Sequence, residues 1–188
     1  DDPESVVHQS LAVQAEFRLK ITGLFLAQMS LMFAVMMVCL YTPAINNMIL
    51  SFEPVHALVC LLTVPVLLAI IFCIKYKAPY SQIAMIAWTV YTGFVAAVCQ
   101  HKVINDNGMY QIFCCGLGGF LVTTILGQMK MGKGAEKKLF SSVGAGAIGS
   151  IVTIAVSATL QSQNVWGGSW GVWLCATGIA ITTVMWIS

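Results

Sequence analysis

The sequence predicts an all-α protein: a polytopic membrane helix bundle of about six transmembrane helices with an N-terminal surface helix. Two observations predict it. Of the 188 residues, 59% are hydrophobic and only 9% are charged, and the mean hydropathy is +0.86. A soluble domain carries about 25% charged residues, so this chain lacks the polar groups to cover a surface in water. Apolar runs of about 20 residues also recur, the length with which a helix crosses about 30 Å of hydrocarbon.

Residues 1–16 form the first predicted domain, an interfacial segment. A cap residue, a proline and an acid stand at its start, as is typical of a helix N-terminus: Asp2, Pro3 and Glu4. Val7, Leu11 and Ala15 share one helical face, so we expect this segment to lie along the membrane surface. A solvated terminal helix is the alternative.

Residues 17–188 form the second predicted domain, which holds the six crossings. Pro43 ends the first crossing, because a proline disfavours helix in the residue before it, and Pro65 should kink the second. We expect the crossings at 17–42, 54–74, 79–100, 110–128, 139–160 and 169–188.

The fifth crossing carries small residues at every fourth position, which places them on one side of a helix. In a bilayer, such a stripe lets two helix backbones approach closely and gain van der Waals contact. We therefore expect helix packing by Ser141, Ala145, Gly149, Thr153 and Ser157, together with Gly116 and Gly119 of the fourth crossing. A substrate-lining helix is the alternative reading of this stripe.

Basic residues predict how the chain is oriented. With six crossings, eight of the nine basic residues fall on one side and only Lys102 falls on the other, a positive-inside pattern. Both termini should face the cytosol, or the matrix of a mitochondrion. The residues expected at the lipid headgroups are Arg18, Lys20, Lys75, Lys77, Lys130, Lys133, Lys137 and Lys138, and on the opposite side Trp166, Trp170 and Trp173.

Ionisable residues are missing from the depth of every predicted crossing, which argues against pumps, coupled transporters and voltage sensors. No nucleophile–base pair is evident, so we expect no enzyme and no catalytic residue. Gly127 to Lys133 resembles a phosphate-binding loop, but Gly134 replaces its Ser/Thr and no strand precedes it, so we expect no nucleotide site. The net charge of +2 is too small to indicate a nucleic-acid partner.

Cofactors are not predicted either, although bound phospholipid is compatible with the basic loops. The seven cysteines lie in or beside apolar segments without a CxxC pair, so we expect neither disulfides nor a metal site. His56 and His101 fall on the same predicted side of the membrane, which leaves bis-histidine haem ligation as a minor alternative.

Several segments resemble the transmembrane Bax inhibitor motif family. The quoted stretches are Glu16-Phe17-Arg18-Leu19-Lys20 before LFLAQMSLMFAV, Tyr41-Thr42-Pro43, VCLLTVPVLLAIIFC, Lys77-Ala78-Pro79-Tyr80-Ser81-Gln82 with WTVYTGFVAAV, and WLCATGIAITTVMWIS. The resemblance implies a calcium-leak fold whose sixth helix ends in Tyr-Asp-Thr-Gln and pairs with a seventh. Here that position reads Trp186-Ile187-Ser188 and no seventh helix follows, so we expect the fold without the ion-handling chemistry.

The leading functional hypothesis is a non-enzymatic accessory subunit, packed with other membrane protein subunits and lipids. An organellar membrane is expected, either the mitochondrial inner membrane, with its respiratory and ATP synthase assemblies, or the endoplasmic reticulum. The alternative is a calcium or other ion leak channel that regulates cell death, as in the family that it resembles. A polar path for that channel would use Ser30, Thr89, Thr92, Thr123, Thr124, Thr153 and Ser157.

Overall fold

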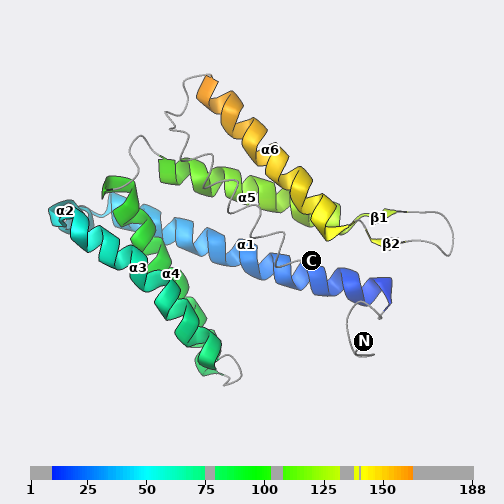
Figure 1. The fold of residues 1–188 in the computed structure, drawn as a ribbon, viewed down its shortest axis with the longest axis horizontal. Coiled ribbons are helices and arrows are strands. Elements are labelled where there is room, and N and C mark those ends of the chain that lie inside the picture. The colour runs from blue at the N-terminus through cyan, green and yellow to red at the C-terminus, as the bar shows by residue number, and fades with distance from the viewer. Residues whose placement is uncertain (1–9, 75–78, 103–107, 132–137, 140, 163–188) are drawn as a thin grey trace. The chain divides into compact units, whose positions relative to one another are not determined.

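The computed structural model describes residues 10–74, 79–102, 108–131, 138–139 and 141–162. These residues form six helices and one short hairpin (Figure 1). The elements are α1 (Leu11–Tyr41), α2 (Pro43–Ser51), α3 (Pro54–Ile74), α4 (Tyr80–Lys102), α5 (Gly108–Gly127), β1 (Lys130–Met131), β2 (Lys138–Leu139) and α6 (Ser142–Ser162). The chain divides into two compact units: a central unit, Gln28–Tyr110, and a terminal unit, made of Asp1–Ala27 and Gln111–Ser188.

Four of the described helices are long and apolar enough to cross a membrane: α1, α3, α4 and the Met109–Gly127 part of α5. The 21 residues of α3 span about 32 Å at 1.5 Å per residue, close to the thickness of the hydrocarbon. The apolar part of α6, Gly144–Thr159, falls short of 18 residues. The chain is thus a helical protein of the membrane type, and the predicted crossing at 169–188 lies outside the described residues.

Three elements differ from the sequence-based expectation. Helix α1 begins at Leu11 and continues without a break through residue 17, where a boundary between two domains is predicted. Most residues around this position, from Gln14 to Lys20, favour helix, so the helix continues through it. A short helix, α2, replaces the loop expected after Pro43, and the predicted basic loop at 129–138 begins and ends in two paired strands. Only the crossing at 54–74 coincides with its helix, α3.

Prolines set the boundaries in the central unit. Thr42 has an extended backbone (φ −88°, ψ 110°), as expected for a residue before proline, and Pro43 then occupies the first turn of α2. Phe52 ends α2 in an extended conformation, and its N–H donates to the carbonyl of Ile49 at 3.1 Å. Pro54 opens α3. The nine residues of α2 therefore connect two long helices through two sharp turns.

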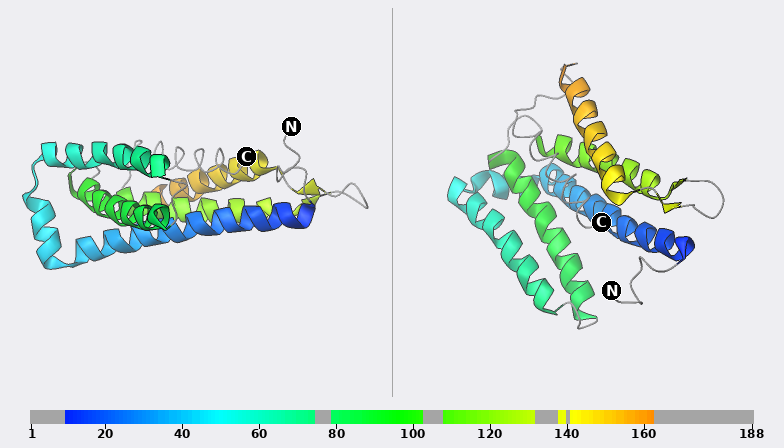
Figure 2. Two further views of the ribbon diagram at one scale, coloured as in Figure 1. Left: turned by 90° about the horizontal axis from the view of Figure 1, so that it is seen from below. Right: turned by 45° about the vertical axis from the view of Figure 1, so that its right-hand side comes forward.

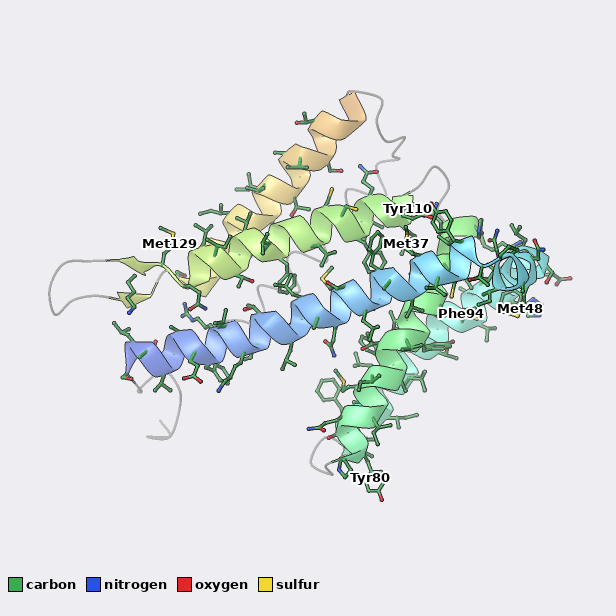
Figure 3. All side chains as sticks on the ribbon, turned by 180° about the vertical axis from the view of Figure 1, so that it is seen from behind. Met37, Met48, Tyr80, Phe94, Tyr110 and Met129 are labelled. Carbon is green, nitrogen blue, oxygen red and sulfur yellow. The ribbon has the colours of Figure 1, made fainter. Side chains whose placement is uncertain are left out.

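Helices α3 and α4 form an antiparallel pair in the central unit, visible side by side in Figure 2. Tyr80 lies at the start of α4 (Figure 3), at the opposite end from the residues that contact α2. Gly93 of α4 meets α1, because a Cβ placed there would lie 2.7 Å from the carbonyl oxygen of Met32 and 2.8 Å from Cβ of Val35. The missing side chain is therefore what lets α4 approach α1.

In the terminal unit, α5 and α6 pack against each other along one face (Figure 1). The first part of α1 joins them through Phe25 and Phe120, whose ring centroids are 5.7 Å apart. Met129 lies just past the end of α5 (Figure 3), where β1 begins. Strand β1 pairs antiparallel with β2, with Lys130 opposite Leu139.

Candidate functional site

Among the described residues of the terminal unit, small and polar side chains gather where α5 and α6 meet, in what we call the α5–α6 seam. Helix α5 and helix α6 each contribute four buried residues at intervals of four, which places each set in one row along its helix. The seam consists of Gln111, Cys115, Gly119 and Thr123 from α5, and Ala145, Gly149, Thr153 and Ser157 from α6.

Hydrogen bonds between the two rows define an antiparallel register. Gln111 Nε2 donates to Ser157 Oγ at 2.6 Å. One turn further along α5, the Thr153 hydroxyl shares its proton between its own Gly149 carbonyl at 2.8 Å and the Cys115 carbonyl at 3.2 Å. The partner thus moves four residues back on α6 for each four residues forward on α5. Rows of residues at i±4 packing into each other are the most common form of close contact between helices.

Glycines allow the backbones to meet in the middle of the seam. A Cβ on Gly119 would overlap the hydroxyl of Thr153 and lie 3.0 Å from the carbonyl oxygen of Gly149. A Cβ on Gly149 would overlap the hydroxyl of Thr123 and lie 2.6 Å from the carbonyl oxygen of Gly119. Only glycine fits at either position, so the two helices are in direct backbone contact here.

The hydroxyl groups of the described helices mostly bond to their own backbone. Eight of them donate to the carbonyl four residues earlier at 2.7–2.9 Å: Thr22, Thr89, Thr92, Thr123, Thr124, Ser150, Thr153 and Thr159. Such bonds satisfy a hydroxyl within an apolar surrounding. Five of the seven residues expected to line a polar path are therefore engaged in this way; Ser157 accepts from Gln111, and Ser30 is exposed.

The predicted packing residues mostly fall in this seam. Ala145, Gly149, Thr153 and Ser157 lie there with Gly119, and Gly116 is buried on α5. Ser141 is exposed and lies before α6, where its Oγ accepts from the Gly144 N–H at 3.4 Å, so it caps the helix and does not extend the stripe. Sequence reasoning missed three residues of the facing row, for which the spacing of four on α5 was the available signal: Gln111, Cys115 and Thr123.

Gln111 differs from the other residues of the seam because its polar group is only partly satisfied. Its side chain is 0% exposed. The amide nitrogen donates to Ser157, whereas Oε1 has no hydrogen-bond partner among the described residues. A buried polar atom without a partner is rare in folded proteins and calls for a physical explanation.

The predicted headgroup residues are placed only in part. Arg18 is half-buried, and its Nη1 donates to the Gly127 carbonyl at 3.3 Å, which caps the C-terminal end of α5. Lys20 forms an exposed ion pair with Glu16 at 2.8 Å, and Lys130 is exposed at the start of β1. Lys138 belongs to β2, and the others lie outside the described residues: Lys75, Lys77, Lys133, Lys137, Trp166, Trp170 and Trp173.

Two histidines of the central unit bond to residues close to α2. His101 Nε2 is 2.8 Å from Asn46 Oδ1, and His56 Nδ1 accepts from the backbone N–H of Glu53 at 3.2 Å. Lys102 also donates to the Leu50 carbonyl at 2.8 Å, so the end of α4 is tied to α2 twice. Within the described part of the chain, no three His, Cys, Asp or Glu residues form a group able to hold a metal ion.

Aromatic donors of α4 bond to α3 around Pro65. Proline has no N–H, so the Leu61 carbonyl lacks its usual helical donor. On either side of it, Tyr91 Oη donates to the Cys60 carbonyl and Trp88 Nε1 to the Val64 carbonyl, both at 3.2 Å. The Tyr91 hydroxyl also hydrogen-bonds that of Thr63. These two bonds tie α4 to the turn of α3 that contains Pro65.

Comparisons with protein-family models, with curated proteins and with solved structures find no match to this chain. The resemblance to the transmembrane Bax inhibitor motif family therefore remains a prediction from the quoted motifs, and the geometry above is the basis for assigning a function.

Proposed function

We propose that this chain is a non-enzymatic accessory subunit, which packs with other subunits and lipids in a membrane complex. The six-crossing arrangement, with both termini on the cytosolic or matrix side of an organellar membrane, belongs to this proposal. So does a fold similar to that of the Bax inhibitor family.

The uncovered surface of α3 is the observation that carries the proposal. Of its 21 residues, only Ala57 and Ile71 are buried. Large apolar side chains project from the rest of the helix: Val55, Leu58, Val59, Leu61, Leu62, Val66, Ile70 and Phe72 are each at least 45% exposed. Apolar surface of this extent marks a contact with lipid or with another protein.

The hydrogen bonds made by the polar side chains of the α5–α6 seam also support a packing role. Hydroxyls in the α5–α6 seam bond to their own helix or to the facing one, and the glycines at its centre bring the two backbones into contact. A conduit for ions needs polar groups that face water. The seam instead has the composition by which membrane helices associate, small residues with interhelical hydrogen bonds.

Site-specific photocrosslinking in native membranes tests the proposal. A photoreactive amino acid at Leu62, which is 58% exposed, should give a discrete crosslinked band with another membrane protein. The same amino acid at Ala57, which is 1% exposed, is the matched control on the same helix and should crosslink only within the chain. Crosslinks from Leu62 to lipid alone would contradict the proposal.

A further inference from the structure

The partly satisfied amide of Gln111 lies at one end of the α5–α6 seam, where α6 contributes Ser157. A glutamine side chain offers two N–H donors and an oxygen with two lone pairs. Here one N–H reaches Ser157 Oγ at 2.6 Å, and the oxygen has no partner among the described residues. Exchanging the oxygen and nitrogen of the amide would not remove the shortfall, because the NH2 group would then be the unpaired end.

Because Gln111 is buried, the missing hydrogen bond of its amide oxygen is energetically costly. Gln111 is 0% exposed and Ser157 is 1% exposed, so neither residue can complete its hydrogen bonds with bulk solvent. In an apolar surrounding, an unpaired amide oxygen is strongly unfavourable, and native proteins commonly supply a bound water at such a position. The occupant must also be small, since the glycine contact two turns along α5 holds the helices together.

Donors and acceptors at this end of the seam match one water molecule. Ser157 Oγ accepts from Gln111, which leaves its own hydroxyl proton available as a donor. A water bound here therefore has two polar partners, Gln111 Oε1 and the Ser157 hydroxyl, within the range of about two to four that buried waters have in proteins.

We propose that the α5–α6 seam contains a binding site for a single water molecule, which donates to Gln111 Oε1 and accepts from the Ser157 hydroxyl. The water completes the hydrogen bonds of the glutamine and links α5 to α6 at this end of the seam. The site lies within one chain, so the inference does not depend on the proposed function.

Infrared difference spectroscopy of the full chain in lipid bilayers tests the proposal. The spectrum of the wild type minus that of Gln111→Met should contain one sharp water O–H band, which shifts to lower frequency when H2¹⁸O replaces H2¹⁶O. The matched control is Gln82→Met on the exposed face of α4, which should give no sharp isotope-sensitive band. A Gln111→Met difference spectrum without such a band would overturn the proposal.

A second variant keeps the test decisive if Gln111→Met fails to fold. Ser157→Ala removes one partner of the water but retains a small side chain in the seam, and it should lose the same band. Far-ultraviolet circular dichroism establishes that each variant keeps its helices. Persistence of the band in folded Ser157→Ala would exclude a water bound between these two residues.

Discussion

Glycine at position 119 illustrates how one hydrogen atom in place of a side chain determines the packing of two helices. Its neighbour Gly118 is on the same helix, but a Cβ there would meet nothing within 4 Å. The two positions thus differ in what they face, whereas their helix propensities are the same. This pair separates the effect of packing from that of backbone conformation.

Gly119→Ala should therefore destabilise the protein by about 1–3 kcal/mol, the range for overpacking a close contact. Gly118→Ala should be neutral or stabilising, by up to about 1 kcal/mol, because alanine favours helix more than glycine does. Unfolding in mixed micelles, followed by circular dichroism, measures both. Equal effects from the two substitutions would contradict the described register of the seam.

Tyr91 provides a second residue-level test, since its hydroxyl reaches across to α3. Tyr91→Phe should cost about 0.6 kcal/mol, the average for a hydrogen bond between membrane helices. The loss is modest because Thr63 still donates to the Cys60 carbonyl at 2.7 Å. Tyr80→Phe, at a side chain that is 68% exposed, is the control in the same unfolding assay and should change nothing. Equal losses from both variants would argue against the contact between α3 and α4.

At the scale of elements, α4 contacts α1 through Gly93 within the central unit. Gly93→Ala should lower the midpoint of thermal unfolding, because the added methyl group would displace the backbone of α1 near Met32. The control is Gly23→Ala on α1, where a Cβ meets nothing within 4 Å and no loss of stability is expected. An unchanged midpoint for Gly93→Ala would show that α1 and α4 do not approach so closely.

Some elements could be predicted from the sequence and others could not, for physical reasons. Helix α3 coincides with its predicted range because its apolar run lies after one proline and before a basic loop. Helix α2 was not predicted, because its nine residues, from Pro43 to Ser51, are too few to show a helical periodicity in the sequence. Four members of the α6 stripe were identified from their spacing, because glycine and serine stand out in an apolar run.

The facing row on α5 shows where sequence reasoning fails. Gln111 and Cys115 become partners of α6 only through the antiparallel register, which is a non-local property of two helices. Gln111 also directly follows Tyr110, the predicted start of a crossing, where a glutamine is expected to be an ordinary interfacial residue. The burial of Gln111 could therefore be recognised only in the structure.

At the scale of the whole molecule, the proposed topology places Lys102 and Lys130 on opposite sides of the membrane, since α5 lies between them along the chain. The 20 residues of α5 reach about 30 Å, enough for one crossing. In a background without other cysteines, Lys102→Cys and Lys130→Cys should react with a membrane-impermeant thiol reagent from opposite sides of sealed vesicles. Labelling of both from one side would contradict a crossing by α5.

The central claim is that polar groups of these helices stabilise packing and do not conduct ions. Calcium flux into liposomes that contain the purified chain tests it most directly, with protein-free liposomes as the baseline. The account predicts flux at the baseline for the wild type. Flux above the baseline that Gly119→Ala alters and Gly118→Ala leaves unchanged would contradict it, because the α5–α6 seam would then belong to a conducting path.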